Sequence, residues 1–172
     1  MVPGASVTGG ENDTVVRDAD AVVVAVPLSA LESTLAPLTD LLSGKLVISV
    51  VAALDWVDGR PRPARLAEGS AAQRIQALLP HSRVTSGFHT LSADKLGDPS
   101  QYLDEDCIIC GDDRDARRAT MELAGKIEGI RPLSCGRLEN SVYPELLVGM
   151  LATINRIHKV QAGIRLVGIG HD

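Results

Sequence analysis

Residues 21–51 have the sequence AVVVAVPLSALESTLAPLTDLLSGKLVISVV, in which two apolar runs flank a stretch of helical character. The first run, Ala21–Val26, is rich in valine and is followed by Pro27, a pattern typical of a buried strand in a parallel sheet. The second run, Leu46–Val51, is also rich in β-branched residues. The sequence therefore predicts two buried strands separated by about one helix length.

The segment between the two runs carries signals for the start and the end of a helix. Ser29 lies three residues before Glu32, which is the spacing of a capping box, and Gly44 follows the last apolar residue. The residues expected on the apolar face of this helix are Leu31, Leu35, Leu38, Leu41 and Leu42. A strand, a helix and a second strand in this order predict a parallel crossover unit.

The rest of the chain continues the alternation of strands and helices. Residues 54–68 are polar, contain Pro61 and Pro63, and are predicted to form a surface loop. Ser70 is expected to begin a helix that Pro80 ends. Further strands are expected at residues 84–88, 106–110 and 130–133, with a long loop at 89–105, a helix after the Gly111-Asp112-Asp113 turn, a long helix at 138–158, and a last strand in the apolar tail 162–169.

This order of elements predicts an α/β protein with a doubly wound, mostly parallel sheet and a C-terminal helical segment. Ligands of such sheets bind beyond the carboxyl ends of the strands. The turns expected to form the site are Val26-Pro27-Leu28, Val51-Ala52-Ala53, His89-Thr90-Leu91 and Gly111-Asp112-Asp113.

Composition limits the classes of function. The chain has 172 residues, a net charge of −5 and four aromatic residues, so it lacks the cationic surface and stacking rings of a nucleic-acid binder. No run of 18 apolar residues and no signal peptide are present in the sequence, so no membrane association is expected. Three cysteines do not suggest a disulfide framework, and we expect a reducing, cytoplasmic location.

The sequence contains few residues arranged for catalysis or metal binding. Cys107 and Cys110 have C-x-x-C spacing, but on a strand they point to opposite faces and are expected to be structural. The four histidines lack metal-ligand spacing, so no metal site is expected. His89 follows a strand directly, where it could contact a ligand or only stabilise the turn. The fingerprint G-x-G-x-x-G is absent, and Gly9-Gly10 is expected to be a plain turn.

Several segments, taken in order, resemble the NADP-dependent coenzyme F420 reductases (F420H2:NADP oxidoreductases). The most specific are Phe88-His89-Thr90-Leu91-Ser92-Ala93, Cys110-Gly111-Asp112-Asp113 and Ala162-Gly163-Ile164-Arg165. The other matching segments are Val7-Thr8-Gly9 with Glu11-Asn12, Ala19-Asp20 to Val26-Pro27, Gly44-Lys45-Leu46-Val47-Ile48, Gly69-Ser70-Ala71-Ala72, Gly129-Ile130-Arg131-Pro132-Leu133 and Leu138-Glu139-Asn140-Ser141. Together they extend from about Ala5 to Ile169.

The resemblance implies a Rossmann-type NADP domain with a small C-terminal part that closes over the deazaflavin. It implies reversible hydride transfer between C4 of the nicotinamide and C5 of coenzyme F420, with no residue acting as an acid or base. By matched position, Val26, Pro27 and Ala52 would line the nicotinamide, His89 and Leu91 would lie where the rings meet, Ala93 would lie beside the cofactor, and Gly163 and Ile164 would close over the rings. His89 would donate a hydrogen bond.

Family members begin with a strand, a glycine-rich phosphate loop and a second strand, roughly fifty residues that have no counterpart in this sequence. We therefore expect an incomplete Rossmann-type domain at residues 1–135 that lacks the site for the adenosine half of NADP. Residues 136–172 would form the C-terminal helix and tail. The alternatives are a non-catalytic F420-binding or scaffolding paralogue and another Rossmann-type reductase.

The last predicted helix bears on oligomeric state. Tyr143, Leu146, Leu147, Met150, Leu151 and Ile154 would form an apolar face on it, which would belong either to the core or to a dimer interface. We expect small-molecule cofactors as ligands and a homo-oligomer, specifically a homodimer.

Overall fold

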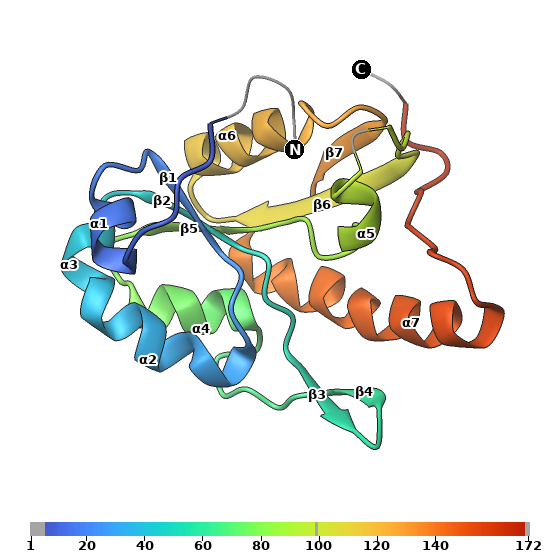
Figure 1. The fold of residues 1–172 in the computed structure, drawn as a ribbon, viewed down its shortest axis with the longest axis horizontal. Coiled ribbons are helices and arrows are strands. Elements are labelled where there is room, and N and C mark those ends of the chain that lie inside the picture. The colour runs from blue at the N-terminus through green and yellow to red at the C-terminus, as the bar shows by residue number, and fades with distance from the viewer. Residues whose placement is uncertain (1–5, 99, 171–172) are drawn as a thin grey trace.

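The computed structural model describes residues 6–98 and 100–170, and Figure 1 shows how they are arranged. In this part of the chain the main sheet has the strand order β1-β2-β5-β6-β7. Its strands are β1 (Ala21–Val24), β2 (Leu46–Ser49), β5 (Arg83–Ser86), β6 (Glu105–Gly111) and β7 (Ile130–Ser134). β1, β2 and β5 are mutually parallel, as are β6 and β7, whereas β5 and β6 are antiparallel. The predicted mostly parallel sheet is confirmed.

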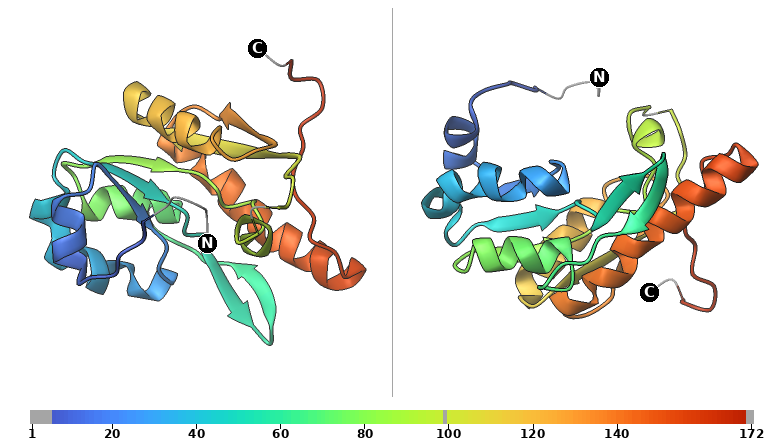
Figure 2. Two further views of the ribbon diagram at one scale, coloured as in Figure 1. Left: turned by 45° about the horizontal axis from the view of Figure 1, so that its top comes forward. Right: turned by 90° about the horizontal axis from the view of Figure 1, so that it is seen from below.

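Helices cover both faces of this sheet, as the doubly wound prediction requires. Helix α6 (Arg114–Ala124) lies on one face, and α4 (Ala71–Leu78) and α7 (Val142–His158) lie on the other (Figures 1 and 2). The remaining helical segments are α1 (Asn12–Arg17), η1 (Leu28–Ala30), α2 (Leu31–Leu35), η2 (Ala36–Leu38), α3 (Thr39–Leu42), α5 (Ala93–Leu96) and η3 (Leu138–Ser141).

Side chains on β2 show how the two layers are filled. Val47 belongs to the larger apolar cluster with Leu35 and Ile75, whereas its neighbour Ile48 packs with Ala116 of α6. Successive side chains of a strand point to opposite faces, so an uninterrupted apolar run is needed when both faces are buried. All four residues of β2 are buried.

Two helix starts are confirmed by their caps. The Ser70 hydroxyl accepts a hydrogen bond from the backbone N–H of Gln73 at 3.1 Å. The Asp113 carboxylate accepts one from the backbone N–H of Ala116 at 2.7 Å. Each cap satisfies one of the N–H groups that the first turn of a helix leaves without an intrahelical partner.

The sequence predicted a single helix after β1. That prediction is wrong about where the helix starts and about its being continuous. Ser29 lies inside η1 and makes no capping bond, and the chain passes through α2, η2 and α3 in succession. Pro37 lies within η2, and since proline has no N–H, it interrupts the α-helical bonding pattern there. The predicted end is confirmed, because Gly44 adopts the left-handed conformation with φ of 74°.

The surface loop expected at residues 54–68 instead contains a hairpin of β3 (Leu54–Val57) and β4 (Arg60–Pro63). Asp58 and Gly59 form its turn with φ of 50° and 68°, which an Asp-Gly pair readily adopts. Ala64 N donates to Ala53 O at 2.9 Å, so the alternation of hydrogen-bonded pairs leaves Pro61 and Pro63 at positions that need no N–H. Figure 2 shows the hairpin extending beside α7.

Two further expectations about chain path are corrected. The tail 162–169 is not a strand; its contacts with the sheet run largely through side chains, as described below. The Gly111-Asp112-Asp113 turn does not join the other site turns. Because β6 runs antiparallel to β5, that turn points towards the amino end of β5. The start of β6 extends past the end of β5 and lies beside the turn that contains Phe88 and Thr90. The long loop before β6 contains the short helix α5.

Candidate functional site

A pocket of about 740 Å³ lies beyond the carboxyl ends of β1 and β2. Three predicted site residues, Val26, Pro27 and Ala52, line it together. The other residues that line it are Ala25, Leu28, Ser29, Glu32, Val50, Val51, Leu54, Asp55, Trp56, Arg74 and Val148. Its wall at the strand ends is formed by small aliphatic side chains, which leave a smooth surface for a flat ligand.

The position of this wall follows from the local sequence. Pro27 leads directly into η1, and its carbonyl accepts a hydrogen bond from Ala30 N at 2.9 Å. On the neighbouring turn, the carbonyl of Ala52 accepts one from Leu54 N at 2.8 Å. Neither residue has a side chain that could fill the pocket, so both turns leave space in front of the sheet.

A buried carboxylate supports this wall from behind. Glu145 on α7 is 1% exposed, and its Oε2 accepts hydrogen bonds from the backbone N–H groups of Ala53 at 3.1 Å and Ala71 at 2.8 Å. Its Oε1 accepts one from Ala72 N at 3.1 Å. Burial raises the pKa of Glu145, while these donors oppose the shift. Glu145 thereby joins α7 to the start of α4 and to the pocket wall.

The sequence interpretation missed Glu145. The signal was a single acidic residue in the apolar stretch Val142–Ala152, since an isolated carboxylate is rarely buried without hydrogen-bond partners.

Charged groups occur on the rim of the pocket. Arg74 and Glu32 form an ion pair at 3.7 Å, and Asp55 on β3 also lines the pocket. The Glu32 side chain is 70% exposed, so this pair contributes little stability. The rim is therefore polar while the wall near the strands is apolar.

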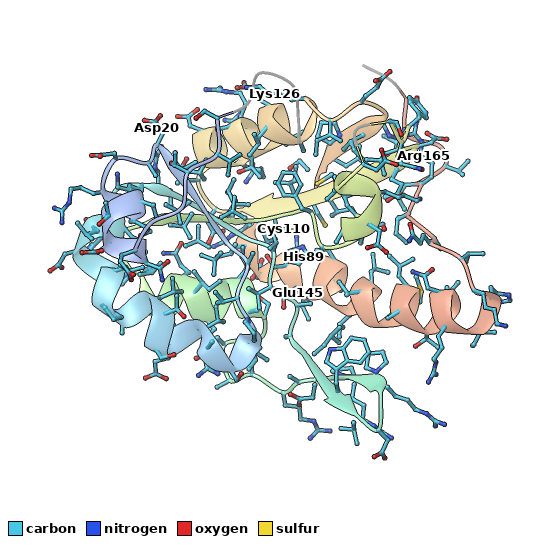
Figure 3. All side chains as sticks on the ribbon, in the orientation of Figure 1. Asp20, His89, Cys110, Lys126, Glu145 and Arg165 are labelled. Atoms are coloured by element: carbon cyan, nitrogen blue, oxygen red, sulfur yellow. The ribbon has the colours of Figure 1, made fainter. Side chains whose placement is uncertain are left out.

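His89 lies at the same edge of the sheet, after β5, where Figure 3 labels it. Both ring nitrogens are buried and have no hydrogen-bond partner in the described residues. Burial lowers the pKa of His89 from 6.5 to about 4, and the nearby Val51 carbonyl opposes this only partly. The imidazole is therefore neutral at pH 7, with one N–H free to donate.

The turn that presents His89 has an unusual backbone. Phe88 adopts a left-handed conformation with φ of 65°, which is costly for a residue with a bulky side chain. Its N–H donates to the Cys107 sulfur at 3.3 Å, and Leu91 N donates to Phe88 O at 3.2 Å. These bonds hold the turn in place. His89 does not line the pocket itself; it lies behind Val51, which does.

The remaining four predicted residues lie near the start of β6. Leu91 is buried in the apolar cluster against α6, and Ala93 is exposed at the start of α5. Gly163 packs against the Glu105 side chain, leaving no room for a Cβ, and Ile164 O accepts a hydrogen bond from the backbone N–H of Asp106 at 2.6 Å. The eight predicted residues thus fall at one edge of the sheet, in two groups with His89 between them.

The two cysteines of the C-x-x-C stretch face opposite sides of the sheet, as predicted. Cys107 packs in the cluster beside α6. Burial raises the pKa of Cys110 to about 11, and Ser86 and Ser141 lie against its thiol on the other side. Among the described residues, no group of three or more His, Cys, Asp or Glu side chains could hold a metal ion. Nor is any helix in residues 6–98 and 100–170 long and apolar enough to cross a membrane.

Comparison with known proteins points in one direction. Residues 3–53 match a family model described as "NADP oxidoreductase coenzyme F420-dependent". The F420-dependent NADP reductase of Methanothermobacter thermautotrophicus is 37% identical over 169 residues, which are 95% of this chain and 73% of that protein. The enzyme of the same name from Methanocaldococcus jannaschii is 32% identical, over 96% of this chain and 75% of that protein.

Solved structures show the same fold. A candidate F420-dependent NADP-reductase from an Arthrobacter species superposes with a TM-score of 0.78 at 20% identity, covering 87% of this chain and 70% of that one. A pyrroline-5-carboxylate reductase from Coxiella burnetii superposes with a TM-score of 0.52 at 14% identity, covering 88% of this chain and 52% of that one.

Proposed function

This chain belongs to the family of F420-dependent NADP reductases, and we propose that it transfers a hydride reversibly between NADP(H) and coenzyme F420. The cofactors supply the chemistry, with the hydride moving between C4 of the nicotinamide and C5 of the deazaflavin. The protein has to place two flat rings face to face and exclude water. It needs neither a nucleophile nor a metal ion for this task.

The observation that carries the proposal is the aliphatic pocket at the carboxyl ends of β1 and β2. Its volume of about 740 Å³ is within the range of sites that hold cofactor-sized ligands. Pro27 and Ala52 present no group that would compete with a nicotinamide ring for hydrogen bonds. The unpartnered nitrogens of His89, at the same edge of the sheet, supply a polar group that a ligand could satisfy.

We assign the residues as follows. Val26, Pro27 and Ala52 line the nicotinamide, and His89 and Leu91 lie where the two rings meet. His89 donates a hydrogen bond from its neutral ring, because an imidazole with a pKa of about 4 is unprotonated at pH 7. Ala93 lies beside the deazaflavin, and Gly163 and Ile164 close over the rings from the tail. No residue acts as a general acid or base.

The division of the chain follows from these roles. Residues 1–135 form the NADP-binding part, and residues 136–172 form the helix and tail that close the F420 site.

The chain spans about three quarters of the length of its curated relatives. The free cysteines are consistent with a reducing cytoplasm.

We further propose that α7 forms a homodimer interface. Tyr143, Leu146 and Met150 are 62%, 40% and 44% exposed on its outer face, whereas Leu151 is buried. A depression of about 450 Å³ lies between this face and the β3–β4 hairpin. Exposed apolar surface of this kind is typical of a contact with another protein. Analytical ultracentrifugation should detect a dimer that Met150→Glu dissociates, and a monomeric wild type would refute the interface.

Turnover of the purified chain tests the proposed function. The wild type should reduce F420 with NADPH, and Ala52→Leu should raise the KM for NADPH at least tenfold because the added side chain enters the pocket. Ala119→Leu, a change of the same size on the exposed side of α6, is the matched control and should behave like the wild type. F420 binding without turnover would instead identify a non-catalytic binder. An unaltered KM in Ala52→Leu would refute the assigned pocket.

A further inference from the structure

Asp106 on β6 is a buried carboxylate whose partners come from two separate parts of the chain, β7 and the C-terminal tail. It is 0% exposed, and Arg131 of β7 donates to both of its oxygens, from Nε at 2.8 Å and from Nη2 at 2.9 Å. Its Oδ2 also accepts the backbone N–H of Leu166 at 2.6 Å, and its Oδ1 lies 3.4 Å from Nη1 of Arg165. The last two residues belong to the C-terminal tail.

The backbone of Asp106 makes further connections. Its N–H donates to Ile164 O at 2.6 Å, and its carbonyl accepts a hydrogen bond from the Thr90 hydroxyl at 3.3 Å. Thr90 follows His89 directly. One residue therefore contacts both the tail and the turn that presents His89.

Arg131 extends the same connection along the tail. Its Nη2 also donates to Leu166 O at 2.7 Å, and its Nη1 donates to Ile169 O at 2.8 Å. Apart from an ion pair of Arg165 with Asp104 at 3.3 Å, all the polar contacts described for residues 163–169 involve Asp106 or Arg131. Figure 3 shows Arg165 where the tail passes the sheet.

The charge balance of this group favours one fixed arrangement. Burial by itself would raise the pKa of Asp106, but the hydrogen bonds from Arg131 and from Leu166 N–H hold it below its ordinary value. A buried ion pair adds little net stability compared with apolar residues of similar size. It does penalise any arrangement in which one charge loses its partner, because a buried unpaired charge is costly. The tail has no strand ladder to fix its position, so this penalty falls directly on its displacement.

We propose that Asp106 is a positioning residue that holds the tail, and with it Gly163 and Ile164, over the place where the two cofactor rings are proposed to meet. The inference rests on the proposed function in one respect, namely that these two residues close over the rings. Asp106 does not touch the reacting atoms; it acts through the backbone of the tail and through Thr90. Losing its charge should therefore release the tail and impair turnover while leaving the NADPH pocket at the other end of the site intact.

Hydrogen exchange and kinetics of Asp106→Asn test the proposal. We expect the amides of residues 162–170 to exchange at least tenfold faster than in the wild type, while peptides from β2 and α4 keep their protection. The kcat should fall at least tenfold and the KM for F420 should rise, with the KM for NADPH changed less than threefold. Asp112→Asn, which alters an exposed ion pair with Arg137 at the other end of β6, is the matched control and should show neither effect.

A second variant covers the case in which Asp106→Asn does not fold. Leu166→Pro removes the N–H that donates to Asp106 at an exposed position without leaving a buried charge unpaired, and it should reproduce both effects. Unchanged tail exchange in the folded variants would overturn the proposal, as would faster exchange with normal turnover. The exchange measurement requires no cofactor. A wild type without turnover would therefore refute the proposed function, while tail protection would still decide the role of Asp106.

Discussion

The neutral state of His89 makes a quantitative prediction about acid stability. Burial lowers the pKa of His89 from 6.5 to about 4 in the folded protein, and the unfolded chain retains the ordinary value. At a pH between about 4 and 6.5 the unfolded chain binds more protons than the folded protein, so lowering the pH favours unfolding. The contribution of His89 is fully present above about pH 6.5 and is lost as the pH falls towards 4. The two values differ by about 2.5 pKa units, which corresponds to about 3 kcal/mol.

His89→Gln isolates this contribution because glutamine does not titrate. We would measure urea-induced unfolding by circular dichroism at several pH values between about 7.5 and 4 for both proteins. The stability of the wild type relative to the variant should fall by about 3 kcal/mol over this range. His81→Gln, which changes an exposed imidazole, is the matched control and should follow the wild type. Parallel curves for wild type and His89→Gln, or an NMR titration of His89 near pH 6.5, would refute the burial argument.

Three further outcomes follow from single contacts. Glu145→Gln keeps one acceptor oxygen but places its amide NH2 against a backbone N–H group, so it should lower the free energy of unfolding by about 1–3 kcal/mol in a urea titration. An unchanged midpoint would contradict the role of Glu145 in joining α7 to α4 and the pocket wall. Asp113→Ala should cost about 1 kcal/mol in the same assay by removing the cap of α6, and Asp113→Asn should restore most of it. Gly163→Ala should reduce F420 turnover at least tenfold, since a Cβ there meets the Glu105 side chain, whereas Gly170→Ala meets open space and serves as the control.

Local patterns were sufficient to predict where the five strands of the main sheet lie in the sequence. The strands at residues 21–24 and 46–49 come from valine- and isoleucine-rich runs that only a sheet covered on both faces can bury. Ser70 was recognisable as a cap because it directly precedes a helical stretch. The Gly111-Asp112-Asp113 turn indicated a helix start, and the structure gives Asp113 as its cap. These features depend on residues close in sequence.

Features that depend on distant partners were predicted less well. The direction of β6 is set by how the chain returns after His89, which no local pattern encodes, and it moves Asp112 away from the site. The β3–β4 hairpin was missed because Pro61 and Pro63 suggested a loop, although Asp58-Gly59 is a hairpin signal. The prolines are tolerated because they occupy positions without ladder bonds.

The residues of the candidate site also differ in whether neighbours in the sequence or distant partners determine them. Val26, Pro27 and Ala52 follow strand ends, so their grouping could be anticipated from the rule for ligand sites in α/β sheets. Asp106 and Glu145, which hold the surrounding backbone, could not be identified in this way. Their hydrogen-bond partners lie up to 92 residues away in sequence, and a carboxylate in an apolar stretch indicates only that some partner must exist.

Direct transfer of an isotopic label tests the central claim. F420H2 carrying deuterium at C5 would be mixed with NADP+ and the purified protein, and the NADPH formed would be analysed by NMR or mass spectrometry. If the chain brings the two rings into contact and excludes water, the deuterium appears at C4 of the nicotinamide. Loss of the label to solvent, or the absence of any NADPH, would contradict the account.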